Sequence, residues 1–405
     1  MKTKSSIICG LDVGTSKICM VIVREHPDGT LEFISSGRAE SRGINKGVVV
    51  NLDEAAAAIR KATDEAEKKV GMSVDMVRLS AGGDHFQGCN SRGAVPVSGE
   101  RQEVTFELAS QVIAASQSLI IPPDREIRHI LTQEFFLDGQ GGIKNPIGLF
   151  GSQLEVNVHI MTCRSALVQN LINAVNHAEM RVQKVIAQPL AAAEAVLNKD
   201  EKELGVAMID IGSGSTNIAV FQQNAVWFTK ILPVGGHSFT RDLAIGLQTS
   251  IEEAERIKKA IGTVSIERSE TEDSIAIPGM GARSSRTITQ KTVCDILRAR
   301  AMELLELIGD QLQMATDGTP LNAGAVITGG GSELSGMTGL AEEVLNMPVR
   351  LGTPMGIRGL DEELLHPQYA TVVGLTQFGV NDFMVATQSK GLRRFIGKVF
   401  SWIEK

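Results

Sequence analysis

Two segments about half the chain apart share one pattern of apolar and polar positions. Residues 7–22 (IICGLDVGTSKICMVI) and 205–221 (GVAMIDIGSGSTNIAVF) each contain an apolar run, Asp-x-Gly, a few small residues and a second apolar run. This order is typical of a strand, a tight turn and another strand, so each segment is predicted to form a β-hairpin. The repetition indicates an internal duplication, with one hairpin in each of two α/β domains.

The two predicted turns have the chemistry of a phosphate site. Glycines at 14, 212 and 214 allow a ligand to approach the backbone closely, and successive N–H groups in such turns bind anions. Asp12 and Asp210 supply hard oxygen ligands for Mg²⁺, through water because this ion keeps its hydration shell. An ordinary hairpin turn would explain either copy alone, whereas the pair favours nucleotide phosphate. The candidate residues are Asp12, Gly14, Thr15, Ser16, Lys17, Asp210, Gly212, Ser213, Gly214, Ser215 and Thr216.

Three further segments supply candidate contacts for a nucleoside. Residues 232–244 predict a Gly-Gly turn before a helix, and residues 323–337 predict a strand, a glycine-rich turn and a helix start. Residues 250–262 predict a helix in which Ser250 and Glu253 have the spacing of a capping box. A solvated helix face is the alternative for the charged residues of that helix. The candidates are Gly235, Gly236, Glu255, Lys258, Lys259, Gly329, Gly330, Gly331 and Ser332.

The last fifteen residues, 391–405 (GLRRFIGKVFSWIEK), have the periodicity of an amphipathic helix. One face would carry Leu392, Phe395, Ile396, Val399, Phe400 and Ile403, with Trp402 at its edge. The opposite side would carry Arg393, Arg394 and Lys398. Such a helix is about 22 Å long, too short to cross a hydrocarbon core of about 30 Å. We therefore expect it to lie in the plane of an anionic membrane surface. Packing on the protein's own core is the alternative, but it leaves the basic face unexplained.

Composition narrows the classes of function. The net charge of −7 argues against a general nucleic-acid binder. The sequence has no apolar run of about twenty residues and no signal-peptide pattern, which predicts a cytosolic protein without a membrane-spanning helix. Five scattered cysteines without a CxxC pair and seven histidines without a cluster indicate reduced thiols and no metal site built from these side chains.

Taken in order, the hairpins and nucleoside segments resemble the actin-like ATPase superfamily, in which two α/β domains with duplicated ribonuclease-H-like cores close over Mg-ATP. The resemblance also identifies residues 186–197 (IAQPLAAAEAVL) as a connecting segment. Gln188 then lies where actin relatives keep the residue that orients the attacking water. A neutral amide is a poor base, so ATPase activity would be weak at most. A glutamine that caps the helix before Pro189 remains the alternative.

Several segments together resemble one family of this superfamily, the bacterial division proteins FtsA. They are the insert at 85–163, GIKNPIG (142–148), DIGSGSTNIAV (210–220), TGGGSEL (328–334) and the basic-aromatic tail. The resemblance implies an ATP-binding scaffold that polymerises on the cytoplasmic face of the membrane at the division site. It also implies that the scaffold tethers filaments of the tubulin-like FtsZ through the tail helix. A soluble phosphotransferase of the same fold, or an actin-like membrane protein of another system, is the alternative.

The resemblance also implies partners and subdomains. The FtsZ C-terminal peptide would dock on subdomain 2B, where Arg283 and Arg286 are candidate contacts or else part of an exposed polar hairpin. Later division proteins would bind subdomain 1C, and copies of the chain would form filaments. The expected boundaries are 1–84, 164–198 and 361–384 for 1A, 85–163 for 1C, 199–226 and 301–360 for 2A, 227–300 for 2B, 385–390 for a linker and 391–405 for the amphipathic helix.

Overall fold

The computed structural model describes residues 5–97, 102–269, 274–277 and 286–379. The predicted linker and tail helix lie outside the described residues, as does Arg283. Within the described part, no helix combines the length and the apolarity that crossing a bilayer requires.

The first domain is built on a five-stranded sheet in the order β11-β6-β1-β2-β3. Strands β1 and β2 form the first predicted hairpin, and β6 and β11 run parallel to β1. Helices α1 and α3 contact each other and one side of this domain, while α4 and α11 pack together against β1 and β6. The elements are β1 Ser6–Val13, β2 Lys17–Glu25, β3 Leu31–Glu40, β4 Ile44–Asn45, β5 Val48–Val49, α1 Leu52–Val70, β6 Met76–Ala81, α3 Ser165–His177, β11 Arg181–Ala187, α4 Gln188–Val196 and α11 Ala370–Gln377.

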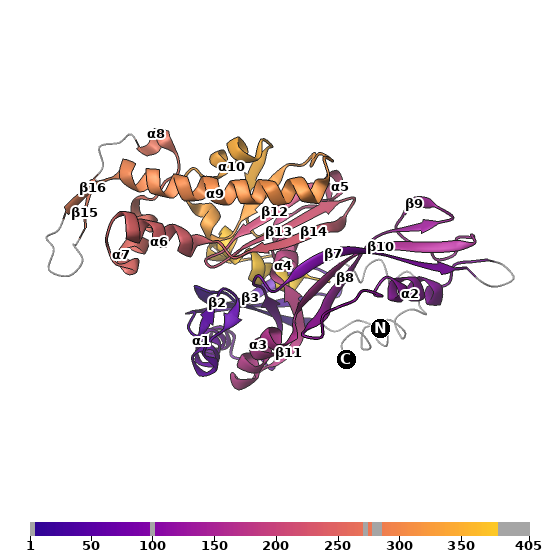
Figure 1. Ribbon diagram of the computed structural model, residues 1–405. Coiled ribbons are helices and arrows are strands. Elements are labelled where there is room, and N and C mark those ends of the chain that lie inside the picture. Colours follow the sequence, from indigo (N-terminus) through magenta and orange to yellow (C-terminus); the bar gives the residue numbers. More distant parts are fainter. Residues whose placement is uncertain (1–4, 98–101, 270–273, 278–285, 380–405) are drawn as a thin grey trace.

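The second domain repeats this arrangement with the order β14-β13-β12-β17-β18. Three strands are again antiparallel and two more run parallel to the first of them. This repeat confirms the predicted duplication, and Figure 1 shows α9 lying across the second sheet. The elements are α5 Lys199–Leu204, β12 Val206–Ile211, β13 Thr216–Gln222, β14 Ala225–Leu232, α6 Gly236–Gly246, α7 Ile251–Ile261, α8 Ile266–Ser269, β15 Ser274–Ile277, β16 Arg286–Thr289, α9 Gln290–Thr316, β17 Ala325–Thr328, α10 Met337–Leu345 and β18 Val349–Leu351. Short 3-10 turns are η1 Gly330–Glu333, η2 Glu362–Leu365 and η3 Pro367–Tyr369.

The insert is a separate lobe with its own sheet, in the order β7-β10-β8-β9. Its elements are β7 Gln87–Pro96, α2 Phe106–Ala115, β8 Arg125–Leu137, β9 Gln140–Ile143 and β10 Gln153–Arg164. Val112 of α2 and Val156 of β10 are fully buried in a core that belongs to this lobe. Figure 1 places the lobe and the β15–β16 hairpin at opposite ends of the molecule.

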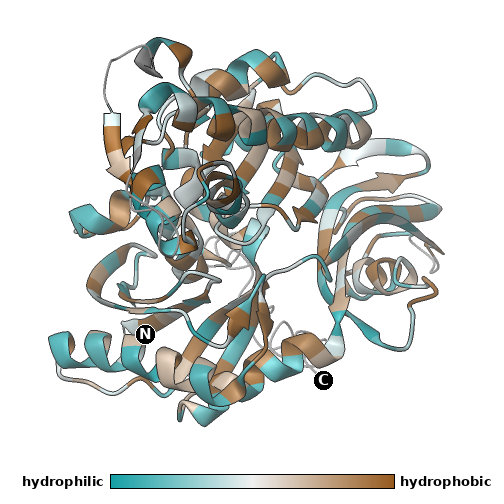
Figure 2. Ribbon diagram, turned by 60° about the vertical axis from the view of Figure 1, so that its left-hand side comes forward, coloured by the Kyte–Doolittle hydropathy of each residue, from teal (hydrophilic) through white to brown (hydrophobic). Residues whose placement is uncertain are grey.

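The central strands are apolar because both of their faces are covered. Every residue of β12 is buried, as are the last six residues of β1. Continuous apolar runs of this kind are typical of strands between two layers of helices. In Figure 2 brown segments are concentrated toward the interior of the molecule, whereas the outer helices carry teal residues on one side. The two predicted hairpins are therefore held rigidly in the centre of the molecule.

Only half of the capping box predicted for α7 forms. The Ser250 side chain accepts a hydrogen bond from the backbone N–H of Glu253 at 3.2 Å. The Glu253 carboxylate turns instead to Arg256, with contacts of 2.8 and 2.5 Å. The arginine three residues later offers a charged donor, which a carboxylate prefers to a backbone N–H.

Candidate functional site

A cavity of about 670 Å³ lies between the two domains, and the two hairpin turns form its facing walls. The turns have matching geometry, because the N–H of Gly14 bonds to the Lys17 carbonyl and that of Gly212 to the Ser215 carbonyl. A Cβ atom on Gly214 would lie 2.8 Å from Thr15 Oγ1 of the opposite turn. The structure thus brings together two segments that are almost two hundred residues apart.

The cavity collects most of the residues predicted for the site. Its lining includes Asp12, Gly14, Thr15, Ser16, Lys17, Gln188, Asp210, Gly212, Ser213, Gly214, Ser215, Gly236, Glu255, Lys258, Lys259, Gly329, Gly330 and Gly331. Three predicted residues lie behind the lining in the described structure. Thr216 donates to the Val234 carbonyl at 2.8 Å, and Ser332 donates to the Gly329 carbonyl at 2.7 Å. Gly235 packs against the Gly212 carbonyl, so all three hold the loops rather than face the cavity.

Two carboxylates lie buried at the base of the cleft. Burial raises the pKa of Asp12, although Ser80 Oγ donates a hydrogen bond to it at 2.6 Å. Burial also raises the pKa of Asp210 to about 6, and the negative charge of Asp12 adds to the effect. Asn217 Nδ2 donates to Asp210 at 2.9 Å and Thr371 Oγ1 at 3.4 Å. The charged form of two neighbouring buried carboxylates is unfavourable by itself. A bound cation stabilises that charged form, so the pair is a favourable site for a cation.

Lys17 reaches into the same cleft from the start of β2. Burial lowers the pKa of its ammonium group to about 8. Its Nζ donates to Gln368 Oε1 at 2.8 Å and lies 3.6 Å from the centroid of the Tyr369 ring. These partners are uncharged, so the positive charge of Lys17 stays available to an anion in the cavity.

Gln188 is the first residue of α4 and lines the cavity beside Asp12, where its carboxamide acts to lower the pKa of that carboxyl group. The residue that caps α4 is Ala187, so the interpretation of Gln188 as a helix cap was wrong. A Cβ atom on Gly82 would lie 1.9 Å from Gln188 Oε1. The carboxamide therefore occupies a place that only a glycine at position 82 leaves open.

Residues of α6 and α7 close the side of the cavity. Lys258 Nζ lies 2.7 Å from the Glu255 carboxylate and donates to Thr240 Oγ1 at 2.8 Å and to the Gly236 carbonyl at 3.1 Å. Thr240 also donates to Glu255. Burial alone would raise the pKa of Glu255, but the hydrogen bonds from Lys258 and Thr240 hold it below its usual value. The carboxylate thus stays charged and able to accept hydroxyl donors.

Sequence reasoning missed several residues of the lining. Asn217 extends the second hairpin motif by one position, and the period-2 alternation of β13 would have placed it on the same side as Ser215. Gln368 and Thr371 come from the C-terminal return of the chain, where no local pattern marks them. The others are Val13, Gly47, Phe239, Ala260, Gly262, Glu333, Leu334 and Ser335.

The arrangement of two like domains around this cleft is shared with solved structures. The PilM-PilN type IV pilus biogenesis complex superposes with a TM-score of 0.67 at 17% identity, covering 92% of this chain and 98% of that one. MreB5 of Spiroplasma citri bound to ADP gives 0.56 at 12% identity, covering 94% and 98%. The fold is therefore the actin-like two-domain fold, with an inserted lobe.

Sequence comparisons give the particular family. A model described as "Cell division protein FtsA" matches residues 207–374, and one described as "SHS2 domain inserted in FTSA" matches residues 83–162. The FtsA of Pseudomonas aeruginosa is 36% identical over 374 residues, covering 92% of this chain and 89% of that protein. The FtsA of Escherichia coli is 32% identical over 410 residues, covering 100% and 97%. The chain belongs to the FtsA family of cell division proteins.

Proposed function

We propose that this division protein binds Mg-ATP in the cleft between its domains. The observation that carries the proposal is the pair of facing turns, each with Asp-x-Gly, whose two carboxylates are buried at the base of the cavity. Phosphate oxygens would accept from the turns, and Lys17 would add a positive charge. The cavity is also of a size that holds a small-molecule ligand. A structural relative, MreB5, is described as bound to ADP.

The residues present also fit a magnesium ion. Asn217 Oδ1 is buried and has no hydrogen-bond partner among the described residues, so it is available to a coordinated water molecule. Asp12 and Asp210 would hold the same hydrated ion, which supplies charge neutralisation for the phosphates. Gln188 would orient a water molecule, and because an amide is a poor base, hydrolysis would be slow at most.

Asp210→Ala tests the site. Removal of this carboxylate should weaken Mg-dependent ATP binding about tenfold or more, since a charge-assisted contact contributes about 1.5–3 kcal/mol. Titration calorimetry with and without Mg²⁺ measures it, and Asp200→Ala on the surface of α5 is the matched control. Wild-type affinity for both ATP and Mg²⁺ in Asp210→Ala would contradict the proposal.

We further propose that the protein is a scaffold on the cytoplasmic face of the membrane at the division site. The amphipathic tail would attach it to anionic lipid, copies of the chain would associate into filaments, and subdomain 2B (227–300) would bind the C-terminal peptide of FtsZ. The insert would recruit later division proteins. Family membership and the hydrophobic periodicity of residues 391–405 support this proposal. The exposed Ile147, Leu149 and Phe150 of the insert are apolar groups that a protein partner would cover.

A further inference from the structure

The insert does not project freely from the first domain but also contacts the second one. It contacts β14, the edge strand of the second sheet. On the outer side of β14, the backbone groups have no neighbouring strand among the described residues. Asn90 Nδ2 donates to the Trp227 carbonyl at 3.1 Å, and Gln133 Nε2 donates to the Val226 carbonyl at 3.0 Å. Side-chain amides of the insert thus satisfy carbonyls of an edge strand.

His159 of β10 lies at the centre of this contact. One ring nitrogen, Nδ1, is 2.7 Å from Asn90 Oδ1, and the other, Nε2, is 2.8 Å from Thr229 Oγ1 of β14. The amide of Asn90 donates to Trp227, so its oxygen must accept, which places the imidazole proton on Nδ1. Thr229 then donates to Nε2. A Cβ atom on Gly88 would lie 2.4 Å from Thr229 Oγ1, so the two lobes meet without spare space.

A second bridge lies at the rim of the same interface. Lys144 Nζ donates to the Gln223 carbonyl at 2.7 Å in the turn between β13 and β14, and to the Gln133 carbonyl of its own lobe at 3.0 Å. Lys144 is exposed, in contrast to the buried His159. The interface therefore combines buried hydrogen bonds, such as the one between His159 and Thr229, with an exposed, charge-assisted hydrogen bond from Lys144.

On its other side, the insert is hydrogen-bonded to the first domain beside the cleft. His129 Nε2 of β8 accepts the backbone N–H of Ala187 at 3.0 Å, directly before Gln188. Across the cleft, Thr229 pairs with Ala219 of β13, whose first residue follows the second phosphate turn. The insert is thus bonded to the end of β11, directly before Gln188 of the cavity lining, and to β14, the neighbour of β13 in the second hairpin. A rotation of one domain relative to the other must deform one of these contacts.

We propose that the insert is a strut between the domains, so that nucleotide binding in the cleft and the attachment of the insert to β14 are thermodynamically coupled. Directional hydrogen bonds between buried groups tolerate little displacement, so the contact favours one cleft geometry over others. Coupling is reciprocal: a protein that binds the insert and changes this contact changes the affinity for nucleotide by the same factor. The inference rests on the proposed function in taking ATP as the ligand of the cleft.

Tryptophan fluorescence can report this coupling without an added label. It contains two tryptophans, and Trp402→Phe leaves Trp227 as the single one. Trp227 is half-buried at the interface and does not line the nucleotide cavity in the described structure. In this background, saturating Mg-ATP in lipid-free solution should shift the Trp227 emission. A shift there must be transmitted through the structure rather than caused by contact with the nucleotide.

Thr229→Val tests the coupling, because it removes the hydroxyl with little change in volume. It should diminish the emission shift and change the ATP dissociation constant, measured by calorimetry, about fivefold or more. Thr229→Ser retains the hydroxyl and should restore both quantities. Lys144 is exposed, so Lys144→Met does not disturb the core. It should change the emission shift and the ATP dissociation constant in the same direction as Thr229→Val, but by a smaller amount. Lys61→Met on the surface of α1 is its matched control.

The two levels of the proposal fail differently. Normal ATP affinity together with an unchanged Trp227 shift in Thr229→Val and Lys144→Met overturns the coupling and leaves the proposed function intact. Absence of a Trp227 shift in the single-tryptophan protein, while calorimetry detects ATP binding, also overturns the coupling. If the unmodified chain binds no ATP, the proposed function fails and the coupling with it.

Discussion

Two buried histidines of the insert keep their rings uncharged inside the folded protein. Burial, together with the positive charges of Lys184 and Arg128, lowers the pKa of His129 to about 3. Burial lowers the pKa of His159 to about 4. Both rings accept a hydrogen bond, which requires one unprotonated nitrogen. An unfolded chain takes up these protons near pH 6.5, whereas the folded chain resists them.

The free energy of unfolding should therefore fall as the pH decreases below about 6.5. The stabilisation is fully present above the pKa that the histidine has in the unfolded chain, and it is lost as the pH falls toward the lower pKa of the folded state. Between pH 7 and pH 5 the loss amounts to about 2 kcal/mol per histidine. His129→Gln keeps an acceptor for the Ala187 N–H and should reduce this loss by one histidine's share. Urea unfolding at both pH values measures it, with the exposed His237→Gln as control. Equal losses in the two variants would contradict the prediction.

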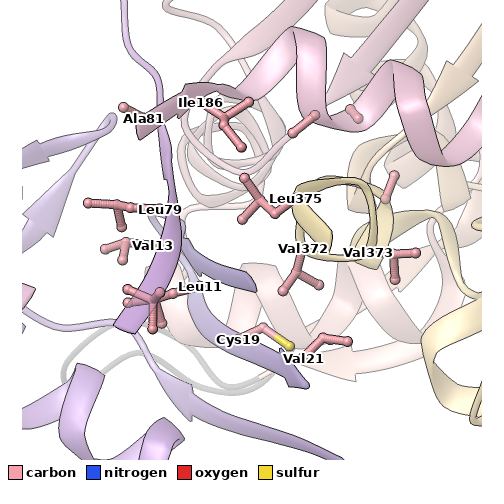
Figure 3. Close-up of a cluster of buried hydrophobic side chains, with 14 of the residues drawn as sticks. Leu11, Val13, Cys19, Val21, Leu79, Ala81, Ile186, Val372, Val373 and Leu375 are labelled. Atoms are coloured by element: carbon pink, nitrogen blue, oxygen red, sulfur yellow. The ribbon is translucent and has the colours of Figure 1, made fainter. Parts of the chain in front are cut away.

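Helices α4 and α11 are in contact along their backbones at the centre of the first domain. A Cβ atom on Gly374 of α11 would lie 1.7 Å from the Ala191 carbonyl of α4. Figure 3 shows Val372 and Leu375 of α11 directed toward the strands of the first sheet. Gln188 begins α4 and Thr371 lies near the start of α11, so this packing sets where both side chains enter the cleft.

Gly374→Ala should destabilise the protein. In an unobstructed helix, alanine gains about 1 kcal/mol over glycine. Here the added methyl group overlaps a carbonyl, and overpacking of this kind costs about 1–3 kcal/mol or more, so the steric term outweighs the helical one. Gly339→Ala in α10, where nothing lies within 4 Å of the new Cβ, is the matched control and should stabilise. Chemical unfolding compares the two, and a stabilised Gly374→Ala would show that α11 can move away from α4.

Opposite charges distinguish the body of the molecule from its C-terminal stretch. The whole chain carries −7, yet residues 390–405 contain five lysines and arginines against one glutamate. Near an anionic surface each cation contributes about 1 kcal/mol. In the proposed attachment, a single tail would therefore bind reversibly, and association into filaments would strengthen the attachment through multivalency.

Trp402→Glu should release the protein from anionic vesicles, weakening binding about tenfold or more, because a charge replaces an inserted ring. ATP affinity should remain at the wild-type value. On a helical wheel Ser401 lies opposite the apolar face, so Ser401→Glu adds the same charge without removing an apolar contact. Vesicle flotation at low and high salt compares the three proteins. Flotation of Trp402→Glu at the wild-type level would exclude the tail as the anchor.

The sequence by itself determined the local parts of this protein. Asp-x-Gly between two apolar runs is typical of a hairpin turn, and its repetition indicates the duplicated fold and the two facing walls of the cleft. Neighbours in the chain dictate these features, so a period of 2 or 3.6 residues reveals them. The FtsA family pattern also resides in such short motifs.

Only the tertiary structure decided which distant groups complete the site. Thr371 reaches Asp210 across 161 positions, and Gln368 reaches Lys17 across 351. The bond between His159 and Thr229 joins an insert to another domain. Each contact depends on where whole sheets meet in space, and a single polar side chain leaves no periodic trace of its partner. The contact between the insert and the second domain therefore follows from the tertiary structure and not from the sequence pattern.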